Sequence, residues 1–329
     1  MSVVAPGRFS STVLQIDAAT EVERLIGRIR SVLRDLRRRG VIVGISGGID
    51  SSVVAALAVR AVGARRVIGL MLPESESSND SLALGRQLAS ELGLQAVVED
   101  IGTMLTAAGC YRRRDEAIRT VVPDYGEGWR CKIVLPDGIE SGTGYAVFTI
   151  VVQSPSGDER RVRLPLDAYL GVLSATNMKQ RVRTLMEYTY ADRFNYAVAG
   201  TPNRLEYDQG FFVKQGDGAA DFKPIAHLYK SQVYQLAAYL GIPEAIQTRR
   251  PTTDTYPLEQ SQEEFYFGLS LEQTDLCVYA RDHGVPPEAV GDATGLTPEQ
   301  VVGAFRMIDR KREAARYLHS APVLFDGHD

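Results

Sequence analysis

Strand and helix patterns alternate over the first third of the chain. The continuous apolar run VIVGI predicts a strand that is buried on both faces of a sheet, and RVIGLML and QAVVEDI predict two more strands. Apolar residues recur at helical spacing before and between these runs. They predict helices over residues 20–39, from about Ser51 to Val62, and over 79–93. Elements of these lengths favour right-handed βαβ units, and therefore an α/β fold with a doubly wound, Rossmann-like parallel sheet.

Two residues are expected to set helix ends in this region. Gly40 follows the first helical pattern and is expected to stop it, because glycine readily adopts the left-handed conformation that ends many helices. Asn79 opens the helical pattern over 79–93 and is expected to cap it, since its side chain can accept a hydrogen bond from a free backbone N–H.

A β-rich segment interrupts the alternation. After a helical pattern near 102–120, residues 123–166 hold three β-rich runs separated by Gly, Ser and Asp turns. We expect this segment to be an inserted hairpin or small sheet. Helical pattern resumes over 177–190, and FNYAVAGT at 194–201 predicts a fourth strand of the core sheet.

The remainder of the chain is expected to be mainly helical. HLYKSQVYQLAAYLG predicts a helix that Gly241 ends, and the charged C-terminal region includes a helix that starts on a Thr-Pro cap. We therefore expect a single domain over residues 1–329, which includes the β-rich insertion 123–166 and a helical C-terminal region 270–329.

Composition narrows the class of protein. The 329 residues are 44% apolar and 24% charged, which is ordinary for a soluble globular protein. The net charge of −4 argues against a nucleic-acid face built on bulk positive charge. The three cysteines are widely spaced and form no CxxC, which argues against a zinc site and favours a reduced, cytoplasmic setting. The N-terminus lacks a signal-peptide pattern and no apolar run reaches about 18 residues, so no membrane association is expected.

The segment GISGGIDSS follows the first predicted strand. Open parallel sheets bind ligands at the carboxyl ends of their strands. Gly47 and Gly48 allow the backbone to approach a phosphate closely, and the start of the following helix offers free N–H groups. The hydroxyl groups of Ser46, Ser51 and Ser52 add further donors. The strand–loop–helix context favours a phosphate site over a merely structural turn.

An aspartate stands within this loop. A carboxylate among phosphates would repel them unless it held a cation. Asp50 therefore implies a Mg²⁺ ion, which prefers carboxylate and phosphate oxygens.

Two segments together resemble a known family. SGGIDSS resembles the pyrophosphate loop of the N-type ATP pyrophosphatase superfamily. GTPNRLEYDQGFFVKQGDGAADFKPIAHLYKSQV, followed by RRPTTD, resembles NAD⁺ synthetases. The resemblance covers roughly residues 20–122 and 170–270, and the last sixty more loosely. It implies an adenine nucleotide alpha hydrolase-like fold.

The resemblance also implies a reaction. The carboxylate of deamido-NAD attacks the α-phosphorus of ATP, pyrophosphate leaves, and ammonia converts the acyl-adenylate into NAD⁺ and AMP. Such an enzyme is a ligase that forms carbon–nitrogen bonds. Its catalysis rests mainly on positioning and on cations that stabilise the departing pyrophosphate.

The resemblance also implies roles for particular side chains. Asp50 and Glu206 would bind Mg²⁺, Lys230 and Thr252 would hold ATP phosphates, and Asp217 would place or deprotonate the ammonium ion. Asp50, Lys230 and Asp217 would thus be catalytic. The implied ATP contacts are Ser46, Gly47, Gly48, Ile49, Asp50, Ser51, Ser52, Thr201, Lys230 and Thr252. The implied deamido-NAD contacts are Asn177, Arg181, Lys214 and Asp221.

Each of these residues has an ordinary alternative when taken alone. Lys230 could be a surface lysine on an amphipathic helix, and Glu206 and Asp217 could be loop acids. Asn177 and Arg181 are expected to share one helical face, which could equally be solvated. Their joint occurrence, in order and at the family's spacing, favours the functional interpretation.

Three departures from the family pattern fall on the acceptor side. The insertion precedes the helix of Asn177, Glu263 and Glu264 stand where the family usually has Asp-Glu, and Arg310-Lys311-Arg312 replaces a His-Lys-Arg. The insertion could be a decorative flap, could reshape the acceptor pocket for another carboxylate, or could dock a partner.

Partners and competing functions follow from the same resemblance. The short family members are homodimers, and no glutaminase domain is expected here, so ammonia is the simplest nitrogen source and a separate glutaminase subunit is the alternative. A related amide ligase for another acid and a non-catalytic nucleotide sensor are the competing functions.

Overall fold

The computed structural model describes residues 9–134, 148–252 and 256–325. Four parallel strands form the central sheet, in the order β3-β2-β1-β7. Their bounds are Val41–Gly44 for β1, Val67–Met71 for β2, Gln95–Val98 for β3 and Ala197–Ala199 for β7. The chain moves outward from β1 to β3 and returns to the other side of β1. The position between β1 and β7 is therefore the switch point, where such sheets bind ligands.

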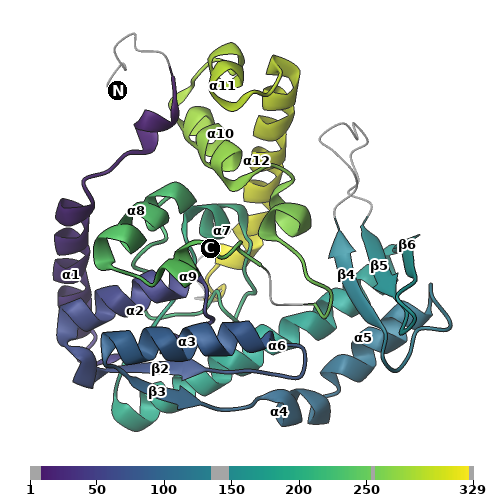
Figure 1. The fold of residues 1–329 in the computed structure, drawn as a ribbon, viewed down its shortest axis with the longest axis horizontal. Coiled ribbons are helices and arrows are strands. Elements are labelled where there is room, and N and C mark those ends of the chain that lie inside the picture. The colour runs from purple at the N-terminus through teal and green to yellow at the C-terminus, as the bar shows by residue number, and fades with distance from the viewer. Residues whose placement is uncertain (1–8, 135–147, 253–255, 326–329) are drawn as a thin grey trace.

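Helices cover both faces of this sheet (Figure 1). Val41 and Val43 point into one apolar cluster and Ile42 into another, as the alternation of a strand requires. One face is covered by α1 (Ala18–Asp35), α2 (Ile49–Val62), α3 (Asn79–Leu92) and α8 (Lys230–Leu240). The other is covered by α4 (Gly102–Ala107), α5 (Cys110–Arg119) and α6 (Leu166–Phe194). The predicted doubly wound α/β fold is confirmed.

Two of the expected helix ends differ from the structure. The first helix ends at Asp35, because Arg37 turns into the left-handed conformation with φ 53° and the Arg39 N–H bonds to the Asn195 carbonyl. Gly40 instead permits a close approach, since a Cβ atom there would collide with the Arg66 carbonyl oxygen. The cap of α3 is Ser78, whose hydroxyl accepts from the Asp80 N–H, and Asn79 is the first helical residue.

The helices around the insertion also differ from the prediction. The helical pattern at 102–120 is two helices, because Gly109 lies between them with φ 76°. The helix expected over 177–190 begins already at Leu166 and runs to Phe194. It therefore takes the start of the segment predicted as strand 194–201. The start of α6 was hard to predict from the sequence. This helix packs against the sheet and α5 and borders a cavity, so its apolar residues are spread over several sides and show no single helical stripe.

The β-rich segment forms a separate antiparallel sheet. Its strands are β4 (Arg130–Val134), β5 (Thr149–Gln153) and β6 (Glu159–Arg163), in that order. Ile133, Ile150 and Val152 pack with the first turns of α6 in a small apolar cluster of their own. Residues 135–147 of the predicted insertion lie outside the described residues. In Figure 1 this sheet stands at one end of α6, away from the central sheet.

The last helices pack together. They are α10 (Leu271–His283), α11 (Pro287–Thr294) and α12 (Pro298–His319), and the predicted Thr-Pro cap of α12 is confirmed, since the Thr297 hydroxyl accepts from the Gln300 N–H. The short elements are η1 (Ser11–Leu14), η2 (Ala64–Arg66), α7 (Arg204–Gln209), α9 (Glu244–Gln247) and the π-helix η3 (Glu263–Phe267). Within the described residues, every helix is too short or too polar to cross a bilayer.

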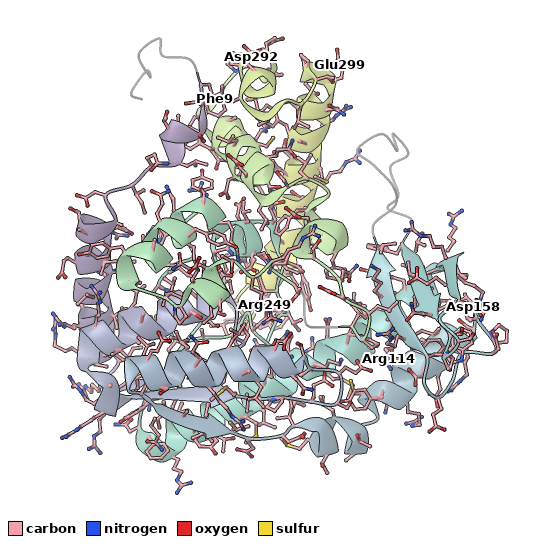
Figure 2. The ribbon with its side chains drawn as sticks, viewed as in Figure 1. Phe9, Arg114, Asp158, Arg249, Asp292 and Glu299 are labelled. Carbon is pink, nitrogen blue, oxygen red and sulfur yellow. The ribbon has the colours of Figure 1, made fainter. Side chains whose placement is uncertain are left out.

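A buried ionic network ties α6 to the loop after β2. Lys179 is 1% exposed, and its Nζ lies 3.0 Å from Glu74 Oε1 and 2.6 Å from Glu76 Oε2. Arg114 of α5 pairs with the same Glu76 at 2.5 Å, and Figure 2 places Arg114 beside the inserted sheet. The network therefore fixes the loop after β2 and α6 relative to each other.

Candidate active site

The loop between β1 and α2 forms a tight cradle of backbone and hydroxyl groups. The Oγ atoms of Ser46 and Ser51 lie 3.1 Å apart, and the Gly48 N–H donates to Ser46 Oγ at 3.3 Å. Gly47 has φ 74°, and a Cβ atom there would collide with the Ser81 carbonyl oxygen. No side chain caps α2 at Gly48, so its first N–H groups are left for an anion.

Asp50 meets two other side chains at the start of α2. Its Oδ2 pairs with Nζ of Lys230, the first residue of α8, and its Oδ1 accepts from Asn203 Nδ2 at 3.0 Å. Lys230 is only 1% exposed, so it is not a surface lysine. Burial alone would lower the pKa of Lys230, but the carboxylates of Asp50 and Glu206 raise it above its ordinary value.

Glu206 brings a second carboxylate to the same place. It lies in α7, where its Oε2 accepts from the Asn203 N–H at 3.1 Å and its Oε1 from Gln262 Nε2 at 2.9 Å. Burial, reinforced by the charge of Asp50, raises the pKa of Glu206 to about 8. Two close carboxylates that face one lysine leave an excess of negative charge whenever both are ionised.

These two carboxylates suit a hard divalent cation. Mg²⁺ in proteins is often held by one or two carboxylates together with phosphate and water oxygens. Within the described ranges, no three His, Cys, Asp or Glu side chains converge as a complete metal site. Asp50 and Glu206 therefore fit an ion that shares its ligands with a phosphorylated substrate.

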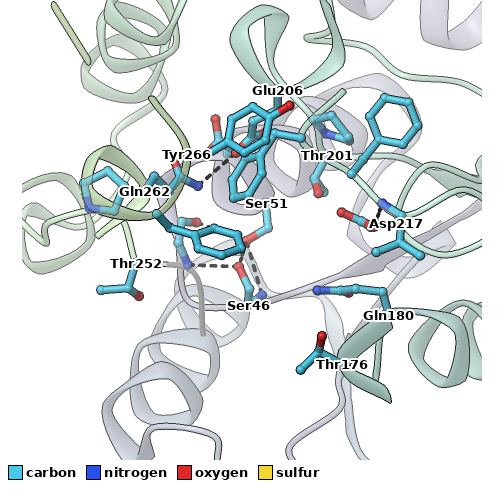
Figure 3. Close-up of a pocket in the computed structure, with 18 of the residues that line it drawn as sticks. Ser46, Ser51, Thr176, Gln180, Thr201, Glu206, Asp217, Thr252, Gln262 and Tyr266 are labelled. Carbon is cyan, nitrogen blue, oxygen red and sulfur yellow. Dashed lines mark hydrogen bonds between the residues drawn. The ribbon is translucent and has the colours of Figure 1, made fainter. Parts of the chain in front are cut away.

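A cavity of about 1030 Å³ opens beside the loop. It extends from Gly44 and the loop, across Thr201 and Thr252, to Ile133 of the inserted sheet. One wall is a stripe of α6 side chains at helical spacing: Tyr169, Leu173, Asn177, Gln180, Thr184 and Glu187. Figure 3 shows Gln180, Thr201, Glu206 and Asp217 around the same space. Elements far apart in the sequence thus share one site.

A second acidic pair lies in the cavity. A Cβ atom at Gly44 would collide with the Glu187 carboxylate, so this glutamate lies against the end of β1. Burial and, secondarily, the charge of Asp217 raise the pKa of Glu187 to about 8, while the charge of Arg183 opposes this rise. Burial also raises the pKa of Asp217 to about 6, although its Oδ1 accepts from the Val213 N–H at 2.8 Å. Glu187 was not anticipated from the sequence, although the stripe on α6 contains it at i+3 from Thr184.

We expect Glu187→Gln to stabilise the protein at about pH 8 and not at about pH 5. The native pKa of about 8 lies above the ordinary 4.5, so Glu187 favours folding when protonated, and this contribution is lost as the pH rises through 8. The unfolding free energy of the wild type should fall by at most about 1.4 kcal/mol per pH unit from this group. Melting temperatures at both pH values measure the effect, with exposed Glu313→Gln as control. Equal shifts at both pH values would contradict the assignment.

The predicted acceptor contacts are only partly brought together. Asn177 lines the cavity, but Arg181, Lys214 and Asp221 do not. Arg181 is exposed and donates to the Lys214 carbonyl at 3.4 Å, while Lys214 Nζ donates to the Tyr317 carbonyl at 2.8 Å. Asp221 accepts from the Val198 N–H at 2.8 Å, in the middle of β7. Asn177 and Arg181 lie four residues apart on α6, but only Asn177 lines this cavity, together with Arg183. The acceptor roles of Arg181, Lys214 and Asp221 stay predictions.

The RRPTTD segment contributes an arginine that the sequence analysis did not assign. Arg249 lines the cavity, and its Nη2 donates to Ser81 Oγ at 3.0 Å. Figure 2 places Arg249 at the centre of the molecule. The final aspartate of this motif lies outside the described residues. An arginine at this position is suited to phosphate groups.

The residues that depart from the family pattern, at 263–264 and 310–312, lie near or beside the cavity or pair with neighbouring side chains. Glu263 pairs with Arg250 at 2.9 Å and accepts from the Leu271 N–H, while the side chain of Glu264 lies outside the described set. Arg310 and Lys311 line the cavity from α12. Arg312 turns away and pairs with Asp208 and Asp282. Burial lowers the pKa of Lys311 to about 7, and its Nζ lies 4.2 Å from the Tyr266 ring centroid.

Comparison with known proteins identifies a matching family profile, related sequences and a solved structure of the same fold. The profile of the NAD synthase family matches residues 21–121 and 167–316. The chain is 57% identical to the NH(3)-dependent NAD(+) synthetase of Rhizobium meliloti (strain 1021), over 96% of this chain and 94% of that protein. It is 32% identical to the enzyme of the same name from Thermotoga maritima, over 92% and 99%. The solved NH3-dependent NAD synthetase of Campylobacter jejuni has the same fold, with TM-score 0.61 and 21% identity over 94% of this chain and 100% of that chain.

Proposed function

Because this chain belongs to the NAD synthase family, we infer that it is an ammonia-dependent NAD⁺ synthetase. It is a ligase that forms a carbon–nitrogen bond and uses ATP to activate the carboxylate of deamido-NAD. The observation that carries this conclusion is the 57% identity with an enzyme of that name over nearly the whole of both chains. The resemblance that the loop and the RRPTTD segment suggested is thereby confirmed.

We propose that the phosphates of ATP lie on the loop after β1. The hydroxyls of Ser46 and Ser51, together with the uncapped N–H groups of α2, suit the triphosphate. Thr201 and Thr252 supply further donors at the cavity wall, and Lys230 supplies the positive charge nearest to Asp50. Asp50 and Glu206 would hold Mg²⁺, which when bound supplies charge neutralisation for the departing pyrophosphate.

The second half-reaction needs neutral ammonia close to the activated carbonyl. We propose that Asp217 accepts the proton that the ammonium ion releases. Its pKa of about 6 keeps it mostly ionised near neutral pH, and it lines the same cavity as the loop. Glu187 faces this region as well, but its pKa of about 8 keeps it mostly protonated near neutral pH, so Asp217 is the anionic member of the pair.

An acceptor assay tests the function directly. The purified protein with Mg-ATP, ammonium and deamido-NAD is expected to yield NAD⁺, AMP and pyrophosphate in equal amounts. Omitting ammonium should stop NAD⁺ formation. Release of AMP only with a different acid would refute deamido-NAD as the acceptor, and nucleotide binding without any pyrophosphate release would indicate a sensor.

We also propose a cytoplasmic homodimer that uses free ammonia. Leu166, Leu170 and Leu185 are 69%, 48% and 58% exposed on α6, and such apolar side chains are suited to an interface. The three cysteines are free and buried, which fits a reducing compartment. A separate glutaminase subunit is the alternative nitrogen source, and replacing ammonium by glutamine in the acceptor assay distinguishes the two.

A further inference from the structure

Two buried glutamine side chains line the cavity with amide atoms that have no partner. Gln209, at the end of α7, is 1% exposed, and neither its Nε2 nor its Oε1 forms a hydrogen bond among the described residues. Gln262 is 9% exposed, and its Oε1 is likewise unpaired. A buried polar group without a partner destabilises a fold, so native proteins contain few of them. In a cavity wall, such groups are suited to a ligand.

The backbone around Gln209 is held at both ends of α7. A capping box that includes Glu206 fixes the start of this helix. At its end, the Tyr266 hydroxyl donates to the Gln209 carbonyl oxygen at 2.6 Å, and a Cβ atom on Gly210 would collide with Ala315 of α12. The Gln209 side chain therefore extends from a fixed position, which is the arrangement that a binding group needs.

Both amides lie beside the proposed metal site. Gln262 Nε2 donates to Glu206 Oε1 at 2.9 Å, as Figure 3 shows. Gln209 follows Glu206 by three residues, so the two side chains share one face of α7, about 4.5 Å apart along its axis. Under the proposed function, Asp50 and Glu206 hold Mg²⁺ on the phosphates of ATP. The carboxyl group that becomes joined to the α-phosphate therefore lies near the same face.

The hydrogen-bonding capacity of Gln209 indicates what kind of group it binds. Gln262 already holds Glu206, whereas Gln209 is free at both amide atoms. Its amide is uncharged and offers donors at Nε2 and an acceptor at Oε1. A carboxylate has acceptors only and can satisfy one side of this amide. A carboxamide has an acceptor and a donor and can satisfy both, and the reaction of the proposed function converts the first group into the second.

We propose that Gln209 binds the reacting acyl group while ammonia attacks it, with Nε2 donating to the acyl oxygen and Oε1 accepting from an ammonia N–H. This inference rests on the proposed function and adds a catalytic residue to it. As the C–N bond forms, the C–O bond to AMP breaks and AMP leaves with the electron pair. The surplus proton of the nitrogen passes to the departing phosphate. The Nε2 donor stabilises the negative charge that develops on the acyl oxygen in the transition state.

Rapid-quench kinetics of Gln209→Met test the proposal by separating the two half-reactions. Methionine has a similar length but no amide. Pyrophosphate release should stay within about two-fold of wild type, because adenylation does not use the amide. Formation of NAD⁺ in a single turnover should fall about 10²-fold, the scale of one lost oxyanion donor. The acyl-adenylate should therefore accumulate in the variant and not in the wild type.

A stability measurement and a matched variant exclude a trivial result. Because methionine removes an unpaired amide from a buried position, Gln209→Met should melt at or above the wild-type temperature. Gln260→Met is the control: Gln260 is 2% exposed and also has an unpaired Oε1, but it does not line the cavity. This control loses the bond from Gln260 Nε2 to the Ile133 carbonyl, so its melting temperature should fall. Both of its half-reactions should stay within about two-fold of wild type.

Several outcomes would overturn the inference. Equal losses of pyrophosphate release and NAD⁺ formation in Gln209→Met would assign the amide to ATP or to the shape of the cavity. Unchanged rates in the folded variant would leave Gln209 without a part in the reaction. A melting temperature well below wild type would mean that the amide stabilises the fold. A wild type that makes no NAD⁺ from deamido-NAD would instead refute the proposed function, on which the inference rests.

Discussion

Pyrophosphate release falls by about 10³-fold when Asp50 is replaced by asparagine, the expected effect of losing a charge that acts on the transition state. Asparagine retains the shape of the side chain and can still contact Asn203 and Lys230. It cannot supply the anionic oxygen that a Mg²⁺ ion prefers. Rapid-quench measurement of pyrophosphate from Mg-ATP and deamido-NAD gives the rate.

The same variant is expected to remain folded. In this variant Lys230 loses one anionic partner. Glu206 can replace it, because in the wild type the charge of Asp50 helps to raise the pKa of Glu206. Without that charge the pKa of Glu206 falls back, and Glu206 ionises near neutral pH and balances the buried lysine. A thermal melt within a few degrees of wild type, with pyrophosphate release lost, supports the assignment. Near-normal release would remove Asp50 from the catalytic machinery.

Replacing Lys230 with methionine is expected to reduce both stability and activity. Lys230 is the buried cation between Asp50 and Glu206, and removing one partner of a buried pair costs about 3–5 kcal/mol. The two carboxylates can relieve the repulsion by taking up a proton. The loss of melting temperature should therefore be larger at about pH 8 than at about pH 5. Pyrophosphate release should fall by about 10²–10³-fold, since a charge beside the phosphates is lost.

Lys179→Met provides the matched control. Lys179 is equally buried and pairs with two glutamates, but it does not line the cavity. This variant should lose stability to a similar degree while its folded fraction keeps kcat within a few-fold of wild type. If both variants lost activity equally, the effect of Lys230 would be structural, and its assignment to the phosphates would be wrong.

Local patterns predicted the parts of the site that are continuous in sequence. The VIVGI run and the glycines and serines after it are adjacent along the chain, so the strand, the loop and the start of α2 follow from a single segment. Thr201, likewise, comes two residues after the end of β7 and therefore lies at the same edge of the sheet. Parallel strands place their carboxyl ends together, which is a property of the sheet itself.

Residues whose role depends on packing were harder to predict. Lys230 has the pattern of a surface lysine, yet the packing of α8 against α2 buries it beside Asp50. Glu187 became part of the site because Gly44 leaves space for its carboxylate. The sequence could not show that Arg181 lies outside the cavity, because the face of α6 that meets the cavity depends on how α6 lies on the sheet, and α6 begins well before its expected start.

By itself, the sequence determined the doubly wound sheet, the phosphate loop and the family, because these depend on the spacing of apolar residues along the chain and on short motifs. Only the tertiary structure decided which charges are buried together and which wall the inserted sheet forms. The physical reason is that burial and proximity set both the pKa values and the shape of the cavity. Those are properties of residues such as Glu206, Glu187 and Phe148 that lie far from the loop in sequence and meet only when the chain folds.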